Sequence, residues 1–274
     1  MKSRKSDEGR LKEGRGNGRF QEYKPWIKVH EVPSEGRVHR VYGWKTKRIH
    51  QLLSDLECYY FLIMQFNDKV VDIREQYPLL PLEQTIAIAE EHGIKHPAIE
   101  NKQSKEVVMT TDFVLTLKGK NKNYDIARTI KEKSKLSKKR VCEKFFIEEK
   151  YWDIKGVNWG IVTDSEIPKV KGKNLLFLYQ DYFWVEDNKL SIKEVDVLTY
   201  KFINMLVTNN FNIINTTTKF DIYNNWECGK SLNFFKYLLI NKVLITDFSK
   251  RINFSTMKVD IAKGGIYFKW TNCL

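Results

Sequence analysis

The stretch Val107–Lys131 reads VVMTTDFVLTLKGKNKNYDIARTIK, and it decides the fold that the sequence predicts. Two runs rich in strand-forming residues flank a polar segment that contains a glycine, which is typical of a β-hairpin. With the turn centred on residues 119–122, Asp112 lies opposite Thr129, and period-two alternation puts Thr129 and Lys131 on one face. Lys131 is then a diagonal neighbour of Asp112, about 7–8 Å away along the backbone.

The hairpin alone leaves two interpretations of Asp112 and Lys131 open. A carboxylate and an ammonium that converge on one sheet face can hold a metal ion and activate a water molecule. The same two groups can also form a salt bridge on a solvated face, because a lone charge pair specifies little.

The composition points to two domains and a polyanionic partner. A chain of 274 residues is longer than one core usually spans, and its hydrophobic fraction of 42% is enough for packed cores. The 47 Lys and Arg residues exceed the 34 Asp and Glu residues and give a formal charge of +13. Such an excess favours a polyanion as partner, and nucleic acid is the commonest one.

Other features exclude whole classes of protein. No run of eighteen apolar residues occurs, so we expect no membrane association, and residues 1–10 lack the apolar centre of a signal peptide. The cysteines are far apart, which argues against a zinc site or a disulfide framework and fits a reducing cytoplasm. They are Cys58, Cys142, Cys228 and Cys273.

Changes in residue pattern divide the chain into three parts. We expect a basic flexible arm over 1–24, an α/β domain over 25–168 and a mainly helical domain over 169–274, with a linker at Pro168–Lys173. Besides the hairpin, the patterns predict helices near 52–66, 82–92 and 138–154 and strands near 69–75 and 158–164. In the last part they predict helices at 190–209 and 230–241, then strands at 244–247 and 256–260. This order suggests a winged helix, which can bind DNA or protein.

Two glutamates have local explanations. Ser54 and Glu57 fit a capping box, in which the hydroxyl and the carboxylate satisfy backbone N–H groups at the start of a helix. Glu148 falls within the apolar face of the helix near 138–154, so it needs a polar partner or a wet neighbour.

Several blocks, in this order and spacing, carry a resemblance to a known family. They are KEGRG (12–16), PW (25–26), EVPS (31–34), HQLLSDLE (50–57), DIREQYPLLP (72–81), GIKHP (93–97), MTTDF (109–113), IK (130–131), YW (151–152) and the weaker CGKSL (228–232). With these blocks the chain resembles the TnsA family, the endonuclease subunits of heteromeric cut-and-paste transposases in bacterial transposons.

This resemblance implies a fold, an activity and partners. It implies a restriction-endonuclease-like catalytic domain, with a mixed α/β sheet flanked by helices, and a winged-helix-like C-terminal domain. The implied activity is Mg²⁺-dependent cleavage of DNA at the 5′ ends of the transposon, with Mn²⁺ able to substitute. The implied partners are transposon-end DNA, a TnsB-type transposase and a TnsC-type AAA+ ATPase, in the bacterial cytoplasm and at the nucleoid when active.

The resemblance also assigns site residues. The family's metal-site glutamate matches Glu57, its aspartate matches Asp112 and its catalytic lysine matches Lys131, while the backbone carbonyl of Ile130 is an expected further metal ligand. Many such nucleases carry Glu or Gln two residues before the lysine, where this chain has Thr129. A hydroxyl is a shorter and weaker ligand, so any contact of Thr129 with a metal is expected to run through water.

Two other functions stay open, and so do the roles of three residues. A stand-alone nuclease of the restriction or resolvase type would cut DNA without partner proteins, and a non-catalytic basic DNA-binding adaptor would not need Glu57, Asp112 or Lys131. Glu148 is either a buried partner of Lys131 or an ordinary glutamate at the edge of the core. Gln76 and His96 are expected in turn or packing roles.

Overall fold

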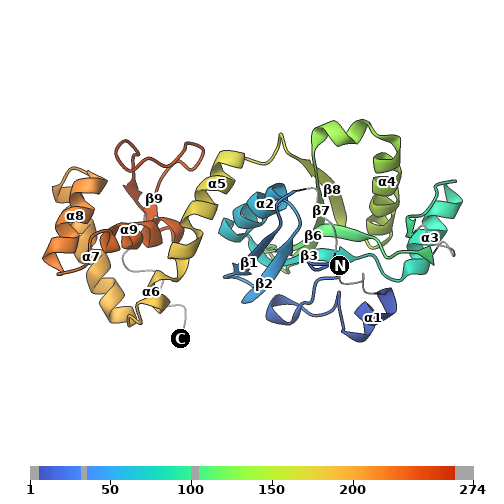
Figure 1. Cartoon of the computed structure of the whole chain (residues 1–274), viewed down its shortest axis with the longest axis horizontal. Coiled ribbons are helices and arrows are strands. Elements are labelled where there is room, and N and C mark those ends of the chain that lie inside the picture. Colours follow the sequence, from blue (N-terminus) through green and yellow to red (C-terminus); the bar gives the residue numbers. More distant parts are fainter. Residues whose placement is uncertain (1–5, 32–35, 100–104, 263–274) are drawn as a thin grey trace. The chain divides into compact units, whose positions relative to one another are not determined.

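The computed structural model describes residues 6–31, 36–99 and 105–262. The chain forms two compact units, Met1–Lys169 and Val170–Leu274 (Figure 1). The first unit contains the helices α1 (Asp7–Lys12), α2 (Asp55–Phe66), α3 (Leu82–Glu91) and α4 (Lys139–Ile154). Its strands are β1 (His39–Gly43), β2 (Arg48–Leu52), β3 (Val70–Pro78), β4 (Ala98–Ile99), β5 (Lys105–Glu106), β6 (Thr110–Leu117), β7 (Tyr124–Lys131) and β8 (Asn158–Thr163).

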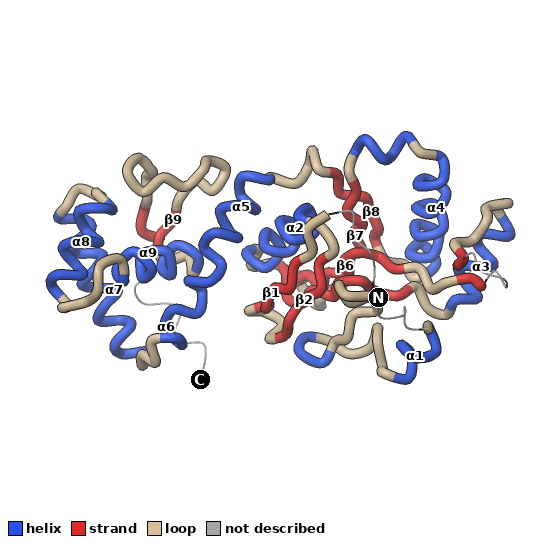
Figure 2. Tube along the Cα trace, in the orientation of Figure 1, coloured by secondary structure: helices blue, strands red, loops and turns tan. Residues whose placement is uncertain are grey.

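A mixed four-stranded sheet in the order β3-β6-β7-β8 forms the centre of the first unit (Figure 2). β3, β6 and β7 are antiparallel neighbours, whereas β8 runs parallel to β7. A parallel pair needs a crossover connection, and α4 supplies it between β7 and β8. The prediction of a mixed sheet flanked by helices is confirmed.

The hairpin has the predicted register. Its pairs run from Leu117 opposite Tyr124 to Phe113 opposite Arg128, so the turn is centred where the polar segment placed it. Asp112 is the first residue of β6 beyond this paired segment.

The two faces of the sheet are covered by different helices. Val114 and Ala127 pack with Ile147 and Tyr151 of α4 in one core cluster. On the opposite face Phe113 meets Tyr60 of α2, with ring centroids 5.4 Å apart. Helices therefore cover both faces of the hairpin next to Asp112, whereas Asp112 and Lys131 themselves are half-buried.

The N-terminal segment predicted as a flexible arm over 1–24 makes specific contacts with the first unit in its described part. Residues 1–5 lie outside the described ranges, but Arg10 and Arg15 are only 1% and 3% exposed. The Arg15 guanidinium donates two hydrogen bonds of 2.7 Å to the carboxylate of Glu31 and one to the carbonyl of Trp26. Further along, the Phe20 N–H donates to Asp72 of β3. The described part of this basic segment is ordered because its arginines find carboxylates and carbonyls on the unit.

The segment predicted as a linker at Pro168–Lys173 is largely helical instead. Helix α5 (Lys169–Leu178) begins where the linker was predicted. Leu175 and Leu178 are fully buried, and the Asn174 amide donates to the carbonyls of Phe248 and Lys250. The predicted linker residues after Lys169 are therefore part of the second unit.

The second unit is mainly helical, as predicted. After α5 it contains α6 (Trp184–Asp187), α7 (Ile192–Thr208), α8 (Ile213–Tyr223), α9 (Lys230–Ile240) and the short antiparallel strands β9 (Leu244–Ile245) and β10 (Asp260–Ile261). The helices predicted at 190–209 and 230–241 are confirmed as α7 and α9, whereas α8 was not predicted. The strand predicted at 244–247 is shorter, and the one predicted at 256–260 is largely wrong, because β10 begins only at Asp260.

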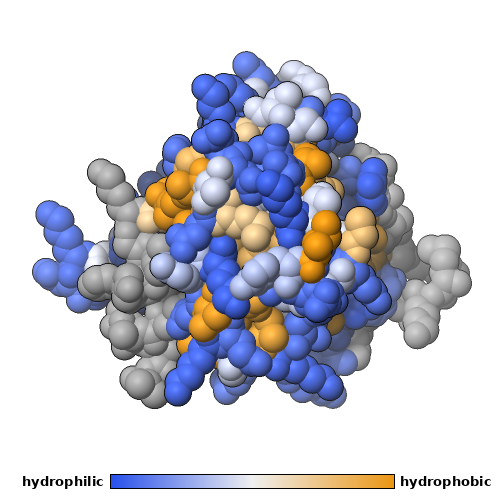
Figure 3. Space-filling model, turned by 90° about the vertical axis from the view of Figure 1, so that its left-hand side faces the viewer, coloured by the Kyte–Doolittle hydropathy of each residue, from blue (hydrophilic) through white to orange (hydrophobic). Residues whose placement is uncertain are grey.

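The surface of the second unit mixes hydrophilic and hydrophobic side chains (Figure 3). On α7 and α8 the apolar side chains of Val197, Ile214 and Ile222 are 53%, 45% and 72% exposed. Within the described ranges, no helix has the length and hydropathy needed to cross a bilayer.

Candidate active site

Asp112 lies where β6 and β7 stop pairing. Because no strand pair continues there, the Ile130 N–H donates to Asp112 Oδ2 at 2.7 Å. Burial raises the pKa of Asp112, while the Ile130 N–H and the positive charge of Lys131 oppose that rise. Lys131 is therefore near enough for its charge to act on Asp112, although the two side chains form no ion pair among the described residues.

Glu57 combines the predicted capping role with a place in this site. Its backbone N–H donates to Ser54 Oγ at 3.2 Å, and its carboxylate accepts from Ser54 Oγ at 3.0 Å and from the Leu53 N–H at 2.9 Å. Burial first, and the charge of Asp112 second, raise the pKa of Glu57. The capped start of α2 therefore holds a carboxylate near Asp112, at the start of β6.

Lys131 is the cationic group of the site. It ends β7 and is half-buried. In the described part of the chain it forms no ion pair, although its positive charge lowers the pKa of Asp112.

Thr129 faces Glu148 of α4. The Thr129 hydroxyl and the Thr111 hydroxyl both donate to Glu148 Oε1, the latter at 2.6 Å, and Trp159 Nε1 donates to the same oxygen at 3.0 Å. Burial raises the pKa of Glu148 to about 7, although the hydrogen bonds from Thr111 and Thr129 oppose the rise. Glu148 thus has the polar partners that its position required, and they include the residue at which the chain departs from the usual nuclease pattern.

Gln76 of β3 is the site residue that sequence reasoning missed. Its amide donates to Glu57 Oε2 at 3.3 Å and also acts on Asp112, whose pKa it lowers. Its only sequence signal was its position inside a block shared with the TnsA family. His96, in contrast, hydrogen-bonds Thr85 and the carbonyl of Pro97, which agrees with a packing role.

The donor set suits a hard divalent cation. The residues that the structure describes contain no cluster of three or more His, Cys, Asp or Glu placed to hold a metal ion together. Glu57 and Asp112 are nevertheless two neighbouring carboxylates whose charges are poorly compensated, as their raised pKa values indicate. Mg²⁺ is commonly held by one or two carboxylates, with waters and substrate phosphate oxygens completing its shell.

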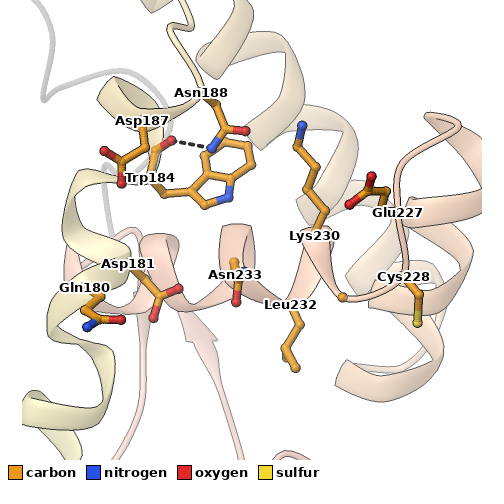
Figure 4. A pocket seen from close by; sticks show the side chains of 11 residues that line it. Gln180, Asp181, Trp184, Asp187, Asn188, Glu227, Cys228, Lys230, Leu232 and Asn233 are labelled. Carbon is orange, nitrogen blue, oxygen red and sulfur yellow. Dashed lines mark hydrogen bonds between the residues drawn. The ribbon is translucent and has the colours of Figure 1, made fainter.

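A cavity of about 700 Å³ lies in the second unit (Figure 4). Asp181 and Asp187 line it from the segment before α7, Glu227 from the connection between α8 and α9, and Lys230 from the first residue of α9. Three carboxylates against one ammonium make this cavity unsuitable for a DNA backbone.

The CGKSL block beside this cavity does not form a phosphate-binding loop. The Asp221 carboxylate accepts from the Gly229 N–H at 2.8 Å and from the Ser231 N–H at 2.7 Å. The N–H groups that a phosphate would need are therefore already satisfied by a side chain of the same unit.

Comparison with known proteins gives matches over both units. The family described as TnsA-like endonuclease N terminal matches residues 67–164, and the family described as TnsA endonuclease C terminal matches residues 166–248. The Transposon Tn7 transposition protein TnsA of Escherichia coli is 40% identical over 233 residues, which are 85% of this chain and 82% of that protein. Asp112 and Lys131 lie within the first family match, and Glu57 precedes it.

Proposed function

Because the chain belongs to the TnsA family of transposition endonucleases, we propose that it cleaves DNA at the 5′ ends of a transposon in a reaction that depends on Mg²⁺. The observation that carries this proposal is the meeting of Glu57 and Asp112 beside Lys131, where β6 and β7 separate. A buried carboxylate, Glu57, beside a half-buried one, Asp112, is costly to fold, and a nuclease site is a physical reason to keep the pair. The fold class proposed with this activity is restriction-endonuclease-like for the first unit and winged-helix-like for the second.

Glu57, Asp112 and the Ile130 carbonyl would hold the divalent cation. When bound, the cation supplies charge that stabilises the phosphate and lowers the pKa of an attacking water. The Ile130 N–H fixes Asp112 Oδ2, and the cap at Ser54 fixes Glu57, so both carboxylates are positioned before DNA binds.

Lys131 acts on the substrate side. Its ammonium, free of a carboxylate partner among the described residues, is available to orient the water and to offset the negative charge that develops on the phosphate. Thr129 reaches the cation through water, or acts on the site only through Glu148, to which its hydroxyl is bound.

The proposed protein partners are a TnsB-type transposase, which would cut the 3′ ends, and a TnsC-type ATPase. The exposed apolar side chains of α7 and α8 support a protein-binding role for the second unit, because such groups on a surface often mark an interface.

The test is a cleavage assay with donor DNA, Mg²⁺, the TnsB-type transposase and the TnsC-type ATPase. Asp112→Asn, Glu57→Gln and Lys131→Met are expected to abolish the 5′ cuts and to leave the 3′ cuts of the transposase. Glu149→Gln, an exposed residue on α4, serves as the matched control. Normal 5′ cutting by the three site variants would support the non-catalytic adaptor instead. Specific cutting by the wild-type protein alone would support the stand-alone nuclease.

A further inference from the structure

Gln76 lies where strand β3 changes the direction of its side chains. Glu75 points to the β2 side, where the Arg48 guanidinium donates to its carboxylate at 2.8 and 2.6 Å. Tyr77 packs against Trp152 of α4, with ring centroids 5.6 Å apart, although regular alternation would put residues 75 and 77 on one face. The left-handed backbone of Gln76, with φ of 49°, accounts for the switch.

The neighbouring strand switches at the same level. Thr111, paired with Tyr77, is hydrogen-bonded to α4, whereas Phe113, paired with Glu75, packs against Tyr60 of α2. Asp112 lies between them and opposite Gln76. The change of face in both strands therefore puts an amide and a carboxylate side by side at the candidate active site.

The Gln76 amide joins the two candidate metal ligands. Its side chain is 1% exposed and donates to Glu57 Oε2 at 3.3 Å, and its amide also acts on Asp112, whose pKa it lowers. A non-glycine residue in a left-handed conformation is strained, and such strain persists only where the surrounding structure enforces it. Here the Trp26 N–H donates to the Gln76 carbonyl at 3.1 Å and supports that conformation.

The hydrogen bonds of Glu57 also determine which lone-pair sites of its carboxylate are left for a cation. A carboxylate has about four lone-pair sites. Oε2 accepts from the Leu53 N–H and from Gln76, and Oε1 accepts from the Ser54 hydroxyl. Among the described contacts, the remaining site is on Oε1, so Glu57 is arranged to bind through one oxygen.

We propose that Gln76 is a positioning residue that holds Glu57 and Asp112 at the separation needed to bind one divalent cation. The proposal rests on the proposed function, because it assigns the cation site to the same two carboxylates. The amide is neutral, so it bridges the carboxylates without compensating their charge and leaves the attraction for a cation intact. Without it, Glu57 loses the hydrogen bond at Oε2 that fixes its carboxylate, and Asp112 loses the amide that lies opposite it in the strand pair.

The test is Mn²⁺ binding to the full chain without DNA, measured by calorimetry and electron paramagnetic resonance. Gln76→Met removes the amide at similar volume, and Gln76→Gly removes it while relieving the left-handed strain. Both are expected to weaken Mn²⁺ binding by about tenfold or more, since each loses hydrogen bonds to charged groups. The pH at which half of the sites bind Mn²⁺ should also rise, because the ligands must be deprotonated.

Gln65→Met is the matched control. Gln65 is likewise 1% exposed, lies on α2, and accepts from the Lys45 N–H at 3.2 Å. It should bind Mn²⁺ as the wild type does. Unchanged or tighter binding by Gln76→Met, or equal weakening by Gln65→Met, would overturn the positioning role and leave the proposed function standing. Absence of Mn²⁺ binding in the wild type would overturn both.

Discussion

The substitution Glu148→Gln should remove part of the pH dependence of the free energy of unfolding. Glu148 is 3% exposed, and burial raises its pKa to about 7 from an ordinary value of 4.5. A glutamine keeps the oxygen that accepts from Thr111, Thr129 and Trp159 but carries no charge. The substitution therefore isolates the cost of ionising one buried carboxyl group.

The sign and size of this effect follow from the linkage between proton binding at Glu148 and folding. The folded protein holds the proton of Glu148 more tightly than the unfolded chain does, so stability is lost as the pH rises from about 4.5 through about 7. The difference between the pKa values of Glu148 in the unfolded and folded states corresponds to a total loss of about 3 kcal/mol in free energy of unfolding. Roughly 2.5 kcal/mol of this loss falls between about pH 5 and pH 8. Relative to the wild type, Glu148→Gln should gain that amount in free energy of unfolding over this range.

The assay is urea unfolding of the full chain in EDTA, followed by tryptophan fluorescence at several pH values. The chain has two units, so the comparison uses the transition that differs between variants. Glu149→Gln, an exposed neighbour on α4, should give a difference from the wild type that does not change with pH. A flat difference for Glu148→Gln as well would refute the reasoning, because it would mean that Glu148 ionises as easily in the folded state as in the unfolded chain.

Other substitutions address other parts of the molecule. Thr129→Glu puts a second carboxylate against the buried Glu148, so the free energy of unfolding at about pH 8 should fall by at least about 2 kcal/mol. In the same urea assay, adding Glu148→Gln should restore most of this loss. Arg48→Met leaves Glu75, which is fully buried, without its cation, and a loss of about 3–5 kcal/mol is expected by urea unfolding; a loss under about 1 kcal/mol would show that the pair is not structural. Ile222→Asp on α8 should weaken capture by the TnsC-type ATPase and leave the melting temperature within a few degrees, and unchanged capture would exclude this part of α8 from the interface.

The sequence by itself determined the local structure. The short polar segment between two strand-like runs set the hairpin register, because a turn fixes which residues of its two strands face each other. Apolar residues at helical spacing located α2, α4, α7 and α9, and the Ser54 and Glu57 pair located a helix start. Blocks shared with the TnsA family then singled out Asp112, Lys131 and Glu57, because spacing alone had left a metal site and a salt bridge open for the first two and had offered only a capping role for Glu57.

Only the tertiary structure decided which of these groups meet. Period and composition describe one segment at a time, and they do not say which helix covers a strand or where two strands stop pairing. The contact of Gln76 with Glu57 depends on a change of face in β3, and that of Glu148 with Thr129 depends on how α4 crosses the sheet. The basic N-terminal segment looked flexible because its charges had no visible partner, and folding supplied one when Glu31 was brought against Arg15.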